Sequence, residues 1–96
     1  MHRYLRPEGV VVEAVGHLWA AFMPVSGETS LLNDESAAIL DVLLEGPADT
    51  DEVCLRLAAD SDLLPAEMAA AVAACWQQLV DVGAVRPVID SPASRP

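Results

Sequence analysis

The fold is decided by the stretch LWAAFMPVSGETSLLNDESAAILDVLL, which spans Leu18–Leu44. An unbroken apolar run predicts a strand over Leu18–Met23 that is covered on both faces, and the more polar Glu28–Leu32 predicts a short edge strand. Between them lies Pro-Val-Ser-Gly, in which proline presets φ and glycine accepts a positive φ. Asn33 then supplies a helix N-cap. A strand, a turn and an edge strand that leads directly into a helix therefore form the predicted centre of the fold.

A further strand precedes this unit. Val10–Val15 is rich in β-branched residues, and the Gly16-His17 pair that follows suits a two-residue type II′ hairpin turn. Together the three segments predict a three-stranded antiparallel sheet. We expect residues 1–8 to form an N-terminal arm and residues 9–89 to form one domain.

Two helices are predicted directly after the sheet. The first begins at Asn33, keeps apolar residues at helical spacing as far as Leu44, and ends at Gly46-Pro47. Asp49 followed by Glu52 resembles a capping box, so a second, short helix is expected from there to about residue 60.

A third helix is predicted from Pro65, a residue favoured at the first helical position, to about Val82, where Gly83 stops it. Residues 84–89 are expected to form a short closing strand or wing. Asp90–Pro96 is rich in serine and proline and is expected to be a disordered tail. The predicted fold class is thus α+β, with a three-stranded sheet followed by three helices.

The net charge of the chain limits the classes of partner that it can bind. Its 96 residues carry 15 acidic and 5 basic side chains, which gives a formal net charge of −10. Nucleic-acid binding needs lysine and arginine to neutralise phosphates, so a nucleic-acid partner is not expected. The acidic residues either solvate the surface or attract a basic partner. No apolar run approaches the ~20 residues of a membrane span and no secretory signal is visible, so we expect a cytoplasmic protein without a membrane partner.

Few residues are suited to catalysis. His2 and His17 are the only histidines, and the chain shows no nucleophile with its base, no phosphate-binding loop and no metal-ligand spacing. Cys54 and Cys75 fall at apolar helix positions, which favours two small core residues, although a disulfide between them stays open. We therefore expect no enzyme activity, no cofactor and no metal.

The third helix carries more apolar surface than one core requires. At 100° per residue its apolar side chains fill an arc of roughly 200°, whereas a surface helix usually shows a stripe of about 100°. Either this helix is simply the most buried one, or part of the arc lines a groove that a ligand fills. An extended peptide could add to the neighbouring edge strand and place alternate side chains in such a groove.

In order and spacing, several segments resemble the PqqD family of peptide chaperones, the recognition elements for ribosomally made and post-translationally modified peptides. The matching segments are Ser26–Asn33, Ala37–Leu40 and Leu79–Val85. The sequence of residues 18–33 looks most similar to that of the subgroup that accompanies HPr-related kinase modification systems. The resemblance covers about residues 8–88.

This resemblance implies a winged helix-turn-helix-like fold that binds the leader of a precursor peptide as an added strand and presents it to a modifying enzyme. The resemblance to the subgroup implies that this enzyme is HPr-related kinase-like. Carried over by position, the edge strand would pair through its backbone and the third helix would form the groove wall. The expected peptide-binding residues are Glu28, Thr29, Ser30, Leu31, Leu32, Met68, Ala71, Val72 and Cys75.

Two other functions are alternatives to peptide binding. An adapter could dock on a neighbouring kinase-like enzyme through its acidic helical face, and such docking would depend on ionic strength. A DNA-binding winged helix would need basic or amide side chains on its recognition helix, which here offers only Gln77 and Gln78. An exposed edge strand could also pair with its own copy, so both a monomer and an edge-strand homodimer stay open.

Overall fold

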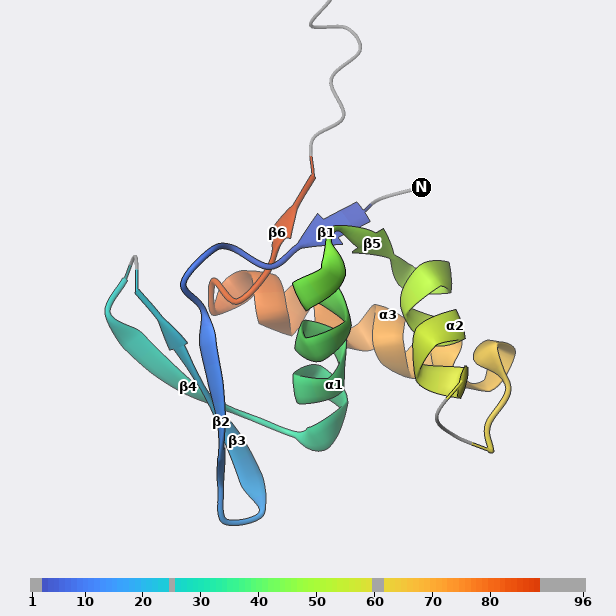
Figure 1. The fold of residues 1–96 in the computed structure, drawn as a ribbon, viewed down its shortest axis with the longest axis horizontal. Coiled ribbons are helices and arrows are strands. Elements are labelled where there is room, and N and C mark those ends of the chain that lie inside the picture. Colours follow the sequence, from blue (N-terminus) through green and yellow to red (C-terminus); the bar gives the residue numbers. More distant parts are fainter. Residues whose placement is uncertain (1–2, 25, 60–61, 89–96) are drawn as a thin grey trace, which may run out of the picture.

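The computed structural model describes residues 3–24, 26–59 and 62–88, and its architecture is α+β, with two three-stranded antiparallel sheets and three helices (Figure 1). The predicted fold class is confirmed at this level. The larger sheet has the strand order β2-β3-β4, and the smaller sheet has the order β5-β1-β6. The strands are β1 (Arg3–Leu5), β2 (Val11–Val15), β3 (Leu18–Met23), β4 (Glu28–Leu32), β5 (Ala48–Asp49) and β6 (Arg86–Pro87). The helices are α1 (Asp34–Val42), α2 (Thr50–Ala59) and α3 (Pro65–Asp81).

The larger sheet forms as predicted. The turn between β2 and β3 contains only Gly16 and His17, because Val15 pairs directly with Leu18. Gly16 has a φ of 61°, whereas His17 does not have a positive φ. Only the first of the two turn residues therefore takes a left-handed φ, which is the type II′ geometry.

The smaller sheet was not predicted. Residues 1–8 were expected to be an arm, yet Arg3–Leu5 forms the central strand of this sheet. It pairs with Ala48–Asp49 on one side and with Arg86–Pro87 on the other. Beyond Pro87, the amide of Val88 donates to the carbonyl of Arg3 at 2.8 Å. The predicted closing strand at 84–89 is thus present but short, and Ile89 and the tail at 90–96 lie outside the described residues.

The helices begin where local capping predicts. The Asn33 side chain accepts a hydrogen bond from the amide of Ser36 at 2.9 Å. Asp49 and Glu52 exchange side-chain hydrogen bonds with each other's amides at 2.8 and 3.2 Å, so the predicted capping box is confirmed. At the start of α3, the Glu67 carboxylate accepts from the amide of the N-cap residue Leu64 at 3.0 Å, which is one half of a capping box. The leucine side chain has no acceptor for the amides of the first turn.

The end of the first helix differs slightly from the prediction. The α-helix ends at Val42, and a turn of 3-10 helix over Leu43–Glu45 carries the chain to Gly46. Gly46 has a φ of 135°, which favours glycine there.

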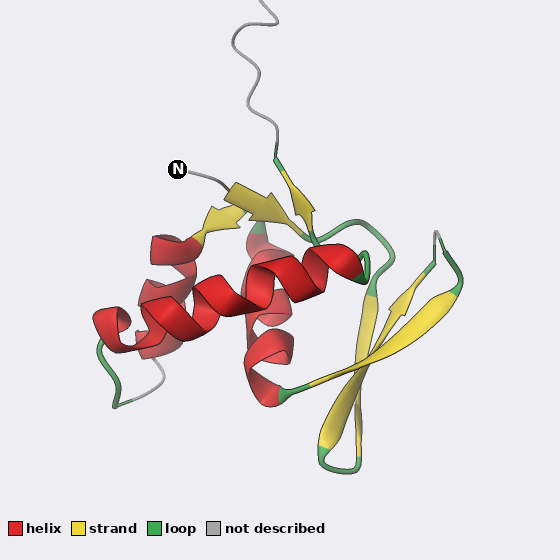
Figure 2. Ribbon diagram, turned by 180° about the vertical axis from the view of Figure 1, so that it is seen from behind, coloured by secondary structure: helices red, strands yellow, loops and turns green. Residues whose placement is uncertain are grey.

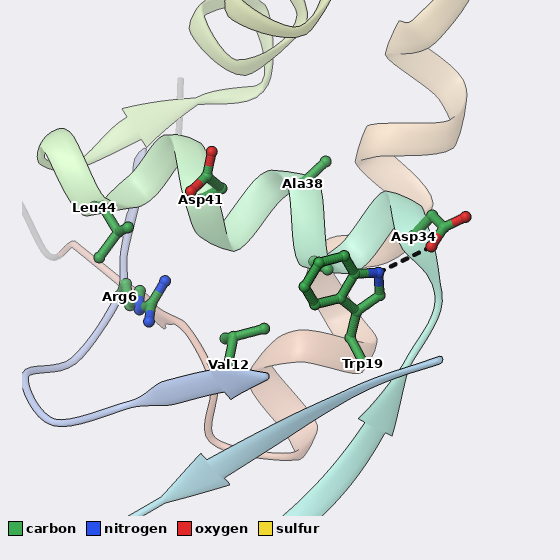
Figure 3. A pocket seen from close by; sticks show the side chains of 8 residues that line it. Arg6, Val12, Trp19, Asp34, Ala38, Asp41 and Leu44 are labelled. Atoms are coloured by element: carbon green, nitrogen blue, oxygen red, sulfur yellow. Dashed lines mark hydrogen bonds between the residues drawn. The ribbon is translucent and has the colours of Figure 1, made fainter. Parts of the chain in front are cut away.

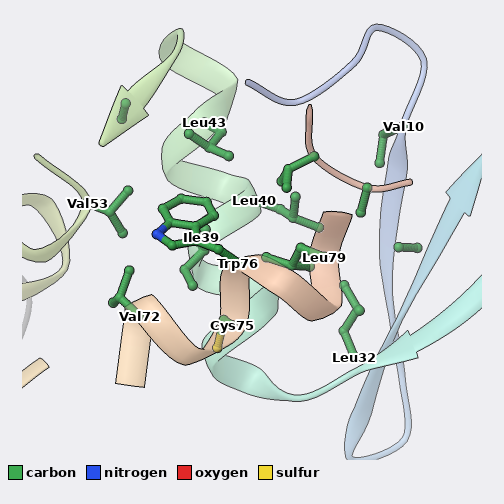
Figure 4. Packing of buried hydrophobic residues seen from close by; sticks show 14 of the residues in the cluster. Val10, Leu32, Ile39, Leu40, Leu43, Val53, Val72, Cys75, Trp76 and Leu79 are labelled. Carbon is green, nitrogen blue, oxygen red and sulfur yellow. The ribbon is translucent and has the colours of Figure 1, made fainter. Parts of the chain in front are cut away.

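The core lies between α1, α2 and α3 and extends from α1 and α3 to the inner face of the larger sheet (Figure 4). Trp76 is the largest side chain in it; its ring stacks on Tyr4 of β1 with centroids 4.1 Å apart, and its indole N–H donates to Thr50 Oγ1 at 2.8 Å. The smaller sheet is therefore fastened to α3 through an aromatic contact. The most deeply buried apolar residues are Ala21, Leu32, Ile39, Leu40, Val53, Cys54, Leu79, Ala84 and Val85.

The outer face of the larger sheet is open, although Leu18–Met23 was expected to be covered on both faces. Trp19, Ala21 and Met23 face the helices, while alternate residues point away from the core. The large apolar side chains exposed on this face are Val11, Val15, Leu18, Phe22 and Leu31. Both cysteines are buried and unpaired, as small core residues. No helix among the described residues is long and apolar enough to cross a membrane.

Candidate functional site

The free edge of β4 is the first component of the candidate site. Within the described residues, β4 pairs with β3 on one side only. Residues of an antiparallel strand direct their backbone groups alternately to the two neighbours. The two-residue turn makes Val15–Leu18 a hydrogen-bonded pair, so Leu18, Ala20 and Phe22 bond toward β2, and the residues between them bond toward β4.

The register of β3 on β4 then decides which groups of β4 stay free. Trp19 lies opposite Leu32 and Ala21 lies opposite Ser30, so Leu32 and Ser30 use their backbone groups to bond β3. Thr29 and Leu31 therefore direct their N–H and C=O groups to the open edge. Their side chains lie on the exposed outer face, and the side chain of Leu31 is 61% exposed. An added strand would find two residues of β4 available for backbone pairing.

The second component is a cavity between α1 and α3, which we call the α1–α3 cavity. It has a volume of about 350 Å³ and opens beside the end of β4, because α1 starts only two residues after Leu32. Its walls are mainly apolar, and three carboxylates lie around it. The lining residues are Asp34, Glu35, Ala38, Ile39, Leu57, Leu63, Glu67, Met68, Ala71 and Val72.

A second cavity lies at the other end of β4, against the end of α3, and we call it the β4–α3 cavity. Its volume is about 450 Å³, and it includes Met23, Glu28 and Val80–Gly83. Figure 2 shows α3 in front of α1, with the larger sheet on the side of the C-terminal end of α3. The start of β4 thus adjoins the last turn of α3, while the end of β4 leads to the cavity beside its first turns. Leu32, Cys75 and Leu79 fill the core between the two cavities (Figure 4).

Of the α3 residues expected to form the groove wall, three line a cavity and one lies in the core. Met68, Ala71 and Val72 all line the α1–α3 cavity. Cys75 lines neither of these two cavities and belongs to the core. Ala71 is exposed, which fits its expected place beside a ligand.

The residues expected on the edge strand also divide. Glu28 lines the β4–α3 cavity. Thr29 and Leu31 present free backbone groups, whereas the backbone groups of Ser30 and Leu32 form hydrogen bonds with β3. Leu32 is 2% exposed and contributes its side chain to the core. Glu28, at the start of β4, lines the β4–α3 cavity, and Asp34, two residues after the end of β4, lines the α1–α3 cavity, while the two cavities share no lining residue.

A third cavity was not anticipated from the sequence. It lies between the inner side of β2 and α1, with a volume of about 450 Å³, and is lined by Arg6, Trp19 and Asp34 among others (Figure 3). The Trp19 indole donates to Asp34 Oδ1 at 2.9 Å. Arg6 donates to the carbonyls of Leu40 and Val10 at 3.0 and 2.7 Å.

The electrostatics of Arg6 fit a structural role. Burial lowers the pKa of its guanidinium, and the nearby Asp41 acts in the opposite direction. Arg6 ties the N-terminal segment to α1 and to the start of β2, so its hydrogen bonds serve the fold.

Several cavity residues escaped the sequence analysis. Leu57 and Leu63 line the α1–α3 cavity, and Val80 and Val82 line the β4–α3 cavity. The apolar arc of the third helix included the two valines, but nothing in it distinguished cavity residues from core residues. Leu63 follows a helix end and shows no periodicity that would have placed it.

Comparison with known proteins adds no identification to this geometry. The chain matches no protein-family model, and neither a curated protein nor a solved structure is significantly similar to it.

Proposed function

We propose that this protein is a non-catalytic peptide-binding adapter of the PqqD type. In this function the leader of a ribosomally made precursor peptide adds as a strand to β4, places side chains against α3, and is thereby presented to a modifying enzyme. The proposed fold is winged helix-turn-helix-like, with α2 and α3 as the packed helix pair. Cytoplasmic localisation belongs to the same proposal.

One observation carries the proposal: a free strand edge runs between two cavities that both adjoin α3. Strand addition requires unpaired backbone groups on one side, and Thr29 and Leu31 supply them. It also requires recesses for alternate side chains, and the cavities at the two ends of β4 supply these. Backbone pairing then gives affinity, and the recesses give selectivity.

A second candidate is a docking adapter for an enzyme, and the open outer face of the larger sheet favours it. The exposed side chains of Val11, Val15, Leu18, Phe22 and Leu31 share that face. Contiguous exposed apolar side chains often mark protein interaction sites. Docking would use side chains of the outer face, whereas strand addition would use backbone groups at the edge of β4, and Leu31 belongs to both surfaces.

The test is a backbone amide NMR titration of the labelled protein with the synthetic leader of a precursor peptide encoded beside its gene. Strand addition predicts the largest shifts at Thr29, Leu31 and residues 65–82. Shifts confined to the outer face of the larger sheet would replace strand addition with the docking adapter. Absence of shifts with every leader tried, in a folded protein, would reject peptide binding.

A further inference from the structure

The α1–α3 cavity combines an apolar floor with an acidic rim. Ile39, Met68 and Val72 belong to its floor, and Leu57 and Leu63 contribute from α2 and from the segment before α3. The rim carries Asp34, Glu35 and Glu67. No lysine or arginine is found among the described residues that line the cavity, and the whole chain contains no lysine at all.

Within the part of the chain that the structure describes, the rim carboxylates form no ion pair. The ion pairs among the described residues are Arg3–Glu52 and Arg56–Glu45, and both lie elsewhere. Asp34 accepts from the Trp19 indole and Glu67 accepts from the Leu64 amide, but neither contact brings a positive charge. An acidic residue of a ligand placed here would meet like charges, whereas a lysine or arginine would meet opposite ones.

The other end of β4 has a mixed lining. Glu8, Glu28 and Asp81 line the β4–α3 cavity together with Arg86. Part of the negative charge there is therefore offset. A basic group of a ligand would therefore be attracted mainly to the α1–α3 cavity.

We propose that the occupant of the α1–α3 cavity is an extended peptide segment that inserts one large apolar side chain and carries a lysine or arginine beside it. This inference rests on the proposed function, because strand addition at β4 is what aims the peptide at the cavity. The volume of about 350 Å³ accommodates one large aliphatic or aromatic side chain. The rim then distinguishes basic leader segments from acidic ones, and it does so more strongly at low salt.

The experiment begins with a displayed library of random twelve-residue peptides selected on the immobilised protein. Peptides bound at the edge are identified by NMR, through shifts of the Thr29 and Leu31 amides. The inference predicts that these peptides are enriched in lysine or arginine next to an apolar residue. Edge-bound peptides that are neutral or acidic would overturn the charge selectivity and leave the proposed function standing.

Selection that yields only peptides without edge shifts, or no binding peptides, would overturn both the proposed function and this inference. The two failures are thus distinguishable. The NMR shifts report whether the edge is used, and the peptide sequences report what the rim selects.

A charge-removal variant supplies the second arm. Glu35→Gln with Glu67→Gln removes two rim charges, and glutamine at residue 67 can still accept the hydrogen bond from the Leu64 amide. Binding of a basic edge-bound peptide should weaken by roughly twofold to fivefold for each lost charge, with a smaller salt dependence. The matched control, Glu45→Gln with Asp51→Asn, removes two charges from residues that line neither cavity. Equal weakening in both variants would show a general charge effect and refute selection by the rim.

Discussion

Proline at Leu31 should block strand addition while the protein remains folded. The amide of Leu31 faces the open edge of β4, so its loss breaks no hydrogen bond to β3. Proline is tolerated on edge strands for this reason. The amide of the neighbouring Ser30 bonds β3 instead, and proline there would break the sheet.

The size of the effect follows from the number of available groups. Thr29 and Leu31 offer one donor and one acceptor each to an incoming strand. Leu31→Pro removes one of these donors, which is worth ~0.5–1.5 kcal/mol, and its ring also occupies the space that the peptide carbonyl would approach. We expect a loss of peptide affinity of at least about tenfold, equivalent to ~1.4 kcal/mol.

The assay is a titration of an edge-bound peptide, measured by calorimetry or fluorescence anisotropy, with the fold of each variant checked by circular dichroism. Ala14→Pro is the matched control, because the register directs the Ala14 amide to the free edge of β2. Leu31→Ala separates the contribution of the side chain, since it retains the amide.

Unchanged affinity in a folded Leu31→Pro protein would refute the derived edge geometry. Equal losses in Leu31→Pro and Ala14→Pro would point to a general effect on the sheet instead. A loss as large in Leu31→Ala would assign the affinity to the side chain on the outer face and not to backbone pairing.

Three further predictions concern stability. Leu79→Ala empties a site with 0% exposure and should lower the free energy of unfolding by ~2–5 kcal/mol in urea denaturation, unlike Leu55→Ala at an exposed position of α2. Ser36 Oγ is buried and finds no hydrogen-bond partner among the described residues, so Ser36→Ala should leave the melting temperature unchanged or raise it, and a marked fall would mean that the hydroxyl is bonded. Burial raises the pKa of the Cys54 thiol above its ordinary value of 9.0, so this thiol should react slowly with iodoacetamide until the protein unfolds. The contribution of the buried thiol to stability is present below pH 9 and is lost as the pH rises through the folded-state pKa. A fall in melting temperature above pH 9 that is absent in Cys54→Ala would reveal this loss.

The local parts of the fold could be predicted because their causes lie within a few residues. The type II′ turn requires a glycine at its first central position, which Gly16 provides. The N-cap at Asn33 requires only the Ser36 amide, and the capping box at Asp49 requires only Glu52. Each contact spans at most three residues. Such features are decided before any tertiary contact forms.

The smaller sheet escaped prediction for the opposite reason. Each of its strands is two or three residues long, too short for any hydrophobic period, and two of them contain or follow a proline. Its pairings connect Arg3 to Asp49 and Tyr4 to Pro87, so they exist only once the helices have brought these segments together. The stack of Tyr4 on Trp76 and the Val88–Arg3 hydrogen bond depend equally on tertiary structure.

The candidate site shows the same division between local pattern and tertiary packing. The edge strand and the helix beside it could be named from the sequence, because polarity marked the first and excess apolar surface marked the second. The individual residues of the site could not be assigned from the sequence. Cys75 and Ala71 are both small and both lie on the apolar arc, yet Cys75 is buried and Ala71 is exposed. The open outer face of β3 could not be foreseen from an unbroken apolar run.

The pairing of β1 with β6 makes the described chain almost a closed ring. Arg3 and Val88 are hydrogen-bonded neighbours, and Figure 1 shows β1 and β6 side by side, apart from the turn between β2 and β3. A short linker from residue 88 to residue 3 would let the chain be reopened at the exposed Gly16-His17 turn, a kind of position where circular permutation is tolerated. Every strand pairing would survive in such a permutant. The order in which the segments are synthesised is therefore separable from the arrangement that holds β4 against α3, and a reporter domain could enter at the hairpin tip without interrupting that arrangement.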